Sequence, residues 1–294
     1  MIYDIRHITR YNYETSVASA RCVIRLTPRE CNQQRLLRHT IETKPKLDNI
    51  RERVDFFGNH VTEATIREPH ERLQIVLTAR VNVRRLAPPA AALTPAWDIV
   101  ARDALKAFRL DAEAPVHMLF PSRLAPFYAP TTQYVRVSFP KGRPILEGAS
   151  ELMTRIRSDF SYDPNATEVA TPLAAAFENR RGVCQDFAHI MISGLRGIGV
   201  PAAYVSGYIR TIPAPGHPLL EGADASHAWV AIWCGDAFGW IHLDPTNAMV
   251  VDDNHIVTAI GRDYADVAPI DGIIVGAGGQ ELEVSVDIKT IPEI

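Results

Sequence analysis

Three things are scarce in this sequence: cysteine, a surplus of one charge, and long apolar runs. Four cysteines among 294 residues, with no CxxC pair, exclude a disulfide scaffold and a zinc ribbon. A formal net charge of −3 gives no field that would attract nucleic acid or an anionic membrane. The apolar runs end well before the roughly 18 residues of a membrane span, and the first residues lack a signal-peptide core. We expect a cytoplasmic protein with no nucleic-acid or membrane partner.

The composition is that of a folded chain with enough apolar material for a large core. Hydrophobic residues make up 47% and charged residues 22%, close to the ordinary globular balance. A length of 294 residues exceeds one average domain. We therefore expect two domains, or one large domain with an appendage.

Residues 1–85 have the pattern of short strands. Apolar and polar residues alternate in runs such as 22–26 and 73–83, and the runs are separated by turn-forming pairs that contain proline or glycine. This pattern predicts an N-terminal antiparallel β domain that resembles a sandwich. None of its residues is a candidate for catalysis.

The pattern changes after residue 85. Residues 86–97 contain three prolines and no charge, which predicts a stiff connector between domains. Beyond it, apolar residues recur at helical spacing over 145–160, and a second helix is expected to open with Thr171 as N-cap. We assign residues 98–294 to an α+β core that ends in C-terminal strands.

A third helix is predicted to begin at Cys184. Gly182 allows a tight turn that delivers the cysteine to the first helical turn, where free N–H groups and the helix dipole favour a thiolate. Alternatively, Cys184 is a buried packing residue beside Phe187 and Met191. On this segment alone, both interpretations stay open.

Two strands that follow the helix predict a partner for this cysteine. Ser226–Trp233 and Gly239–Pro245 flank good turn material, so they form a hairpin. A symmetric turn sets His227 directly opposite Asp244. A slip of one residue on each strand sets Asp244 opposite Trp229 instead, with His227 as its diagonal neighbour on the same face.

Either register lets Asp244 orient the imidazole of His227 while His227 takes the thiol proton of Cys184. The other histidines and cysteines are weaker candidates. His189 lies five residues after Cys184 and is interpreted as a structural helix residue. His242 and Cys234 match no zinc spacing, so we expect no metal site.

The three predicted site residues lie in segments that resemble a known family, the transglutaminase-like superfamily. The segments are Arg181–Ala188, His227–Val230 and Asp244–Thr246, in the family's order. The N-terminal residues 57–61 and the later residues 261–267 are similar to those of its bacterial members, which carry a β domain before the core. The resemblance implies a papain-like core, in which a Cys-bearing helix packs on an antiparallel sheet, and a Cys184–His227–Asp244 triad. The acidic calcium sites of animal transglutaminases have no counterpart in this sequence, so we expect no metal requirement and no cofactor.

The resemblance also implies a reaction. The thiolate would attack a peptide or protein amide, form a thioester and release an amine, and water or a second amine would then resolve the acyl-enzyme. The chain is thus expected to be a cysteine hydrolase or acyltransferase, that is, a peptidase, amidase or transglutaminase. The alternative is a catalytically silent peptide-binding or scaffold protein with the same fold.

Two aromatic residues and one loop are candidates for substrate binding. Trp229 is predicted to share a strand face with His227, and Tyr162 precedes the Cys184 segment in a turn-rich loop. Both could instead be packing residues. The Pro-rich loop 211–224 is predicted to border the cleft.

Overall fold

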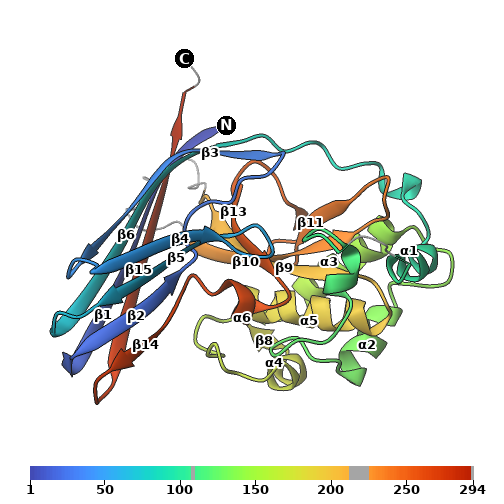
Figure 1. Ribbon diagram of the computed structural model, residues 1–294. Coiled ribbons are helices and arrows are strands. Elements are labelled where there is room, and N and C mark those ends of the chain that lie inside the picture. The colour runs from blue at the N-terminus through green and yellow to red at the C-terminus, as the bar shows by residue number, and fades with distance from the viewer. Residues whose placement is uncertain (107–109, 212–224, 293–294) are drawn as a thin grey trace, which may run out of the picture.

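In the computed structural model, which describes residues 1–106, 110–211 and 225–292, the chain forms a β-sandwich and an α+β core. The sandwich occupies the left of Figure 1 and the core the right. The first six strands are β1 (Ile2–Val17), β2 (Ser19–Ile24), β3 (Gln34–Lys44), β4 (Asn49–Val54), β5 (His60–Ile66) and β6 (His70–Val83). They confirm the expected N-terminal β region.

The last two strands of the chain also belong to the sandwich. β14 (Ile270–Val275) and β15 (Gln280–Ile291) complete two antiparallel sheets, with the orders β14-β2-β5-β4 and β15-β1-β6-β3. The sequence assigns residues 98–294 to the core, so the structure corrects this boundary. The alternating pattern of β15 buries Val286 and Ile288. Such a pattern shows that one face is buried, but not against which sheet.

The core carries the helices. They are α1 (Trp97–Ala104), α2 (Ala129–Arg136), α3 (Ile145–Asp159), α4 (Leu173–Asn179), α5 (Cys184–Gly197) and α6 (Tyr264–Val267), with the 3-10 turns η1 (Ala91–Leu93) and η2 (Pro115–Met118). α3 and α5 match the expected helices. α4 begins one residue later than expected, with Pro172 and not Thr171 as N-cap. Among the described residues, no helix is both long and apolar enough to cross a membrane.

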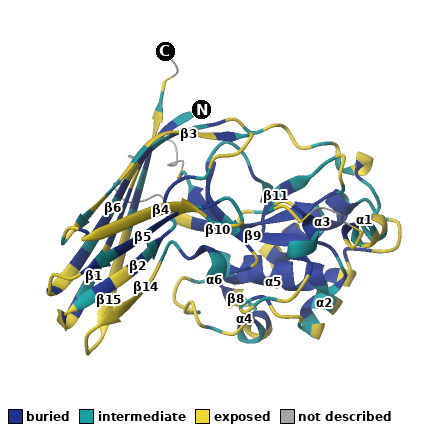
Figure 2. Cartoon of the chain, viewed as in Figure 1, coloured by how far each residue is buried: buried dark blue, intermediate teal, exposed yellow. Residues whose placement is uncertain are grey.

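The core sheet has the order β12-β11-β10-β9-β13. Its strands are β9 (Ala202–Ile209), β10 (Ala225–Trp233), β11 (Trp240–Asp244), β12 (Met249–Val250) and β13 (His255–Gly261), and the short strands β7 (Ser161–Tyr162) and β8 (Arg181–Gly182) pair separately. α5 packs on this sheet, because Phe187 and Leu195 share a buried cluster with Val230 and Ile232. The whole of α5 is dark blue or teal in Figure 2, whereas β4 is exposed.

The sandwich and the core share one apolar cluster. Tyr208 of β9 and Ile256 of β13 pack with Ile5 of β1 and with Val286 and Ile288 of β15. All five side chains are almost completely buried. The inner face of the sheet that contains β1 and β15 therefore lies against the core, and this contact sets the position of the cleft described below.

Candidate active site

Cys184 is the first residue of α5, as the sequence predicts. Asp186 holds the turn before it, because Asp186 Oδ2 accepts hydrogen bonds from the backbone N–H of Val183 (2.8 Å) and the hydroxyl of Thr167 (2.6 Å). A Cβ atom at Gly182 would lie only 2.5 Å from the same oxygen, so this close approach requires glycine. Cys184 itself is partly exposed.

The hairpin of β10 and β11 brings His227 and Asp244 together in the slipped register. Val230 lies opposite Leu243, and continuing this pairing sets Asp244 opposite Trp229, with His227 as its diagonal neighbour. His227 Nε2 lies 2.8 Å from Asp244 Oδ2. Asp244 is fully buried and His227 nearly so. Since Nε2 faces Asp244, Nδ1 is the nitrogen that remains for Cys184.

Electrostatics favour a charged His227. Burial opposes a charge on the ring, but hydrogen bonds to Asp244 and Cys184 outweigh it and raise the pKa of His227 to about 10. Burial opposes a charge on Asp244 as well, yet the hydrogen bonds from His227 and His255 hold the pKa of this carboxyl far below its usual value. Both shifts favour an imidazolium paired with a carboxylate, which is the arrangement that stabilises a negative charge on the neighbouring Cys184.

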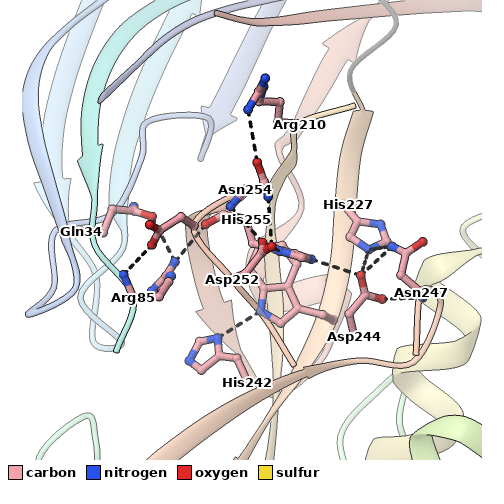
Figure 3. Close-up of polar contacts among 12 residues, drawn as sticks. Gln34, Arg85, Arg210, His227, His242, Asp244, Asn247, Asp252, Asn254 and His255 are labelled. Atoms are coloured by element: carbon pink, nitrogen blue, oxygen red, sulfur yellow. Dashed lines mark hydrogen bonds and ion pairs between the residues drawn. The ribbon is translucent and has the colours of Figure 1, made fainter. Parts of the chain in front are cut away.

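Asp244 has further partners that the sequence analysis missed (Figure 3). Its Oδ2 accepts from the side-chain amide of Asn247 at 2.7 Å and lies 3.2 Å from His255 Nε2. Its Oδ1 accepts from the backbone N–H groups of Thr246 (2.9 Å) and Asn247 (3.2 Å). The turn-forming residues after Asp244 could have indicated Asn247. No local signal indicates His255, which arrives on a different strand.

His255 extends the polar contacts inward. It is fully buried, and its Nδ1 lies 3.0 Å from Asp252 Oδ1. Within the described part of the chain, His227, Asp244 and His255 present ligand atoms close enough to reach one metal ion. Asp244 Oδ2 is already within hydrogen-bonding distance of both imidazoles, so we interpret the three as a hydrogen-bonded chain.

The two aromatic candidates differ in outcome. Trp229 is fully buried, donates its indole N–H to His242 Nδ1 at 3.0 Å and packs against Met118 and Val257. It does not line the cleft, which corrects its predicted role in substrate binding: the hairpin face that it shares with His227 is covered by the protein's own side chains. Tyr162 is half-exposed and lines the cleft beside Cys184.

The sequence also makes predictions about His189, the remaining cysteines and the loop before β10. His189 is buried and its Nε2 accepts the backbone N–H of Tyr264 at 3.2 Å, in agreement with a structural role. Cys22 and Cys234 are buried, and Cys31 is exposed. Residues 212–224 of the predicted cleft loop lie outside the described residues.

Comparisons with known proteins identify the family. The sequence pattern of the bacterial transglutaminase-like N-terminal region matches residues 3–82, and that of the transglutaminase-like superfamily matches residues 135–245. An uncharacterized protein of Mycobacterium tuberculosis (strain ATCC 25618 / H37Rv) is 34% identical over 290 residues, which cover 97% of this chain and 92% of the relative. The chain belongs to the transglutaminase-like superfamily.

Other similar proteins cover this transglutaminase-like chain to different extents. The crystal structure of a candidate cysteine protease from Cytophaga hutchinsonii has a TM-score of 0.77 and 20% sequence identity, and the match covers 100% of this chain and 92% of that one. It confirms the fold. A protein-glutamine gamma-glutamyltransferase of Pseudomonas aeruginosa is 34% identical over 104 residues, which are 32% of this chain but only 15% of the relative.

Proposed function

We propose that this protein is a cysteine hydrolase or acyltransferase that acts on peptide or protein amide bonds through a thioester. The observation that carries the proposal is that Cys184 and His227 line one cavity of about 690 Å³, while His227 Nε2 lies 2.8 Å from Asp244 Oδ2. Nucleophile, base and orienting carboxylate thus meet where a substrate could enter. The names of the relatives, a candidate protease and a glutamyltransferase, support an amide as the bond attacked.

The proposed reaction gives each group a role that is compatible with the geometry. The Cys184 sulfur attacks the amide carbonyl, and His227 gives its Nδ1 proton to the leaving nitrogen, so that a thioester and a free amine form. His227 then removes a proton from water or from a second amine, which attacks the thioester and releases the thiolate. Asp244 stays ionised and holds the ring. The backbone N–H of Cys184, at the start of α5, is one donor for the oxyanion.

The first test is the alkylation of Cys184. Iodoacetamide at neutral pH should label Cys184 far faster than Cys31, because His227 stabilises the thiolate of Cys184; Cys31 is exposed and serves as the comparison thiol. Mass spectrometry of tryptic peptides gives both rates in one sample. His227→Ala should abolish the difference. Equal rates in the unmodified protein would contradict a catalytic Cys184 and favour the silent scaffold.

The second step of the reaction is tested separately. A peptide library incubated with and without an added primary amine distinguishes hydrolysis from transfer, because only a transferase forms the new amide. Cys184→Ala is the control for background cleavage.

The cytoplasmic location expected from the sequence stays a prediction.

A further inference from the structure

The cavity at Cys184 is closed on one side by the sandwich. β1 contributes His7, Thr9 and Tyr11, and β15 contributes Leu282, Val284 and Val286. We refer to these six residues as the β wall. The opposite side is formed by core residues, among them Tyr162, Tyr204 and Tyr264. A ligand that fills this cavity would therefore lie between the two parts of the molecule.

The strand register explains why six residues from two strands form one surface. β1 and β15 are antiparallel, and three successive pairs on one face make up the β wall. The pairs are His7 with Val286, Thr9 with Val284, and Tyr11 with Leu282. Alternate residues of a strand point to the same face, so all six side chains face the cavity side.

The β wall continues the apolar core outward over the site. The next pair inward, Ile5 with Ile288, is fully buried between sandwich and core, and Val286 is also buried. Val284 and Leu282 then emerge, 50% and 55% exposed. Because these side chains point to the cavity side, they offer apolar surface that a ligand could cover.

Among the described residues, the cavity lining carries few groups that could form an ion pair with a charged side chain. Apart from the site residues Cys184 and His227, the described residues that line it include no Asp, Glu, Lys or Arg. His7 is neutral, since burial lowers its pKa to about 4, and its Nε2 contacts the Thr9 hydroxyl at 2.8 Å. A charged group placed here would lose hydration without gaining an ion pair.

We propose that the β wall binds an uncharged apolar side chain of the peptide whose carbonyl Cys184 attacks. This inference rests on the proposed function and names the substrate class: a polypeptide with an aliphatic or aromatic side chain beside the scissile amide. Specificity would then depend on the sandwich, at residues some 170 positions before and 100 positions after Cys184 in the sequence, and less on the core.

Three peptidyl chloromethyl ketones that differ only in the side chain next to the ketone test the proposal. The side chains are Leu, Glu and Lys, and the second-order rate of Cys184 alkylation is measured by mass spectrometry and divided by the rate for iodoacetamide. The Leu probe should react at least about tenfold faster than either charged probe, the scale on which apolar pockets discriminate. Iodoacetamide is too small to depend on the β wall.

Charge substitutions at Leu282 should change which of the two charged probes reacts faster. Misfolding would slow both probes and would not produce opposite preferences in the two variants. Leu282→Glu should make the Lys probe the faster of the two charged probes, and Leu282→Lys should favour the Glu probe. Ile273→Glu is the matched control, since Ile273 is 73% exposed on β14 and does not line the cavity. Its probe ratios should equal those of the unmodified protein.

The two proposals fail in different ways. Slow iodoacetamide labelling of Cys184 in the unmodified protein would overturn the catalytic proposal. Fast labelling, together with equal rates for the three probes or probe ratios that do not change in the Leu282 variants, would overturn the β wall alone. An equal change in Ile273→Glu would also overturn it, because the effect would then be one of general surface charge.

Discussion

Asp244 is the residue on which the polar contacts of the site converge. Its two carboxylate oxygens take up hydrogen bonds from two histidines, one amide side chain and two backbone N–H groups. The carboxylate is fully buried, so its charge is stabilised by these donors and not by water. A substitution that keeps the shape of Asp244 but removes its charge therefore isolates the electrostatic part of its role.

Asp244→Asn should leave the fold intact and reduce turnover by a factor on the order of 10³ to 10⁴, as loss of the orienting carboxylate does in triads. The reason is that an amide can present an N–H to His227 and select the wrong tautomer. Turnover of the best peptide from the library, with circular dichroism as the control for folding, measures the effect. A near-normal rate would show that another group orients His227.

The difference in stability between the unmodified protein and Asp244→Asn should depend on pH. The pKa of His227 is raised from 6.5 to about 10, so the stabilising contribution of its charge is fully present below pH 6.5 and is lost as the pH rises through 10. The stability advantage of the unmodified protein over Asp244→Asn should shrink between pH 6.5 and 10 in urea unfolding. An advantage that stays constant over this range would contradict a charged His227.

At the scale of elements, the centre of the core sheet depends on the close approach of three strands. Gly207 of β9 lies opposite His227 of β10 and opposite Val257 of β13. A Cβ atom there would lie 2.2 Å from the carbonyl oxygen of Ile256 and 2.4 Å from the Trp229 ring. The strands that carry His227 and His255 are thus held together at a position that tolerates no side chain.

Gly207→Ala should destabilise the protein by about 1–3 kcal/mol, the range for overpacking, and slow the alkylation of Cys184, because the Trp229 ring and β13 must shift. Gly276→Ala is the control. It lies between β14 and β15, where an added Cβ would meet Val17 Cγ2 at 3.1 Å, so we expect a cost below about 1 kcal/mol. Equal free energies of unfolding for the two variants would show that the strands separate easily.

At the scale of the whole molecule, the sandwich and the core are joined by a continuous apolar cluster. Val286 of β15 lies in this cluster with Tyr208 of the core and also lines the cavity at Cys184. The four tryptophans, residues 97, 229, 233 and 240, all lie in the core. Tryptophan fluorescence therefore reports on the core, whereas circular dichroism reports on both parts.

Val286→Asp should shift both unfolding transitions together and lower the free energy of unfolding by about 3 kcal/mol or more, because a carboxylate would lose its hydration inside the apolar cluster that the two parts share. Urea unfolding followed by the two signals measures this. Ile273→Asp, at an exposed position, should leave both transitions unchanged. A shift in circular dichroism without a shift in fluorescence would mean that the two parts unfold independently.

The sequence by itself determined the family, the α+β fold and the pairing of His227 with Asp244. α5 and the β10–β11 hairpin have strong local patterns: helical spacing after Cys184, and alternation on both sides of a turn. Periodicity restricts which residues share a face, and a hairpin leaves only neighbouring registers, so His227 and Asp244 could be paired before the fold was known.

The tertiary structure alone decided which distant segments complete the site. β15 pairs with β1 across nearly the whole chain, which moves the end of the sequence into the sandwich and brings Leu282 to the cleft. His255 reaches Asp244 from a separate strand, and Trp229 is covered by Met118 and Val257. Local propensity and periodicity show that a face is buried but not what covers it, because the partner of a face is selected by packing between segments far apart in the sequence.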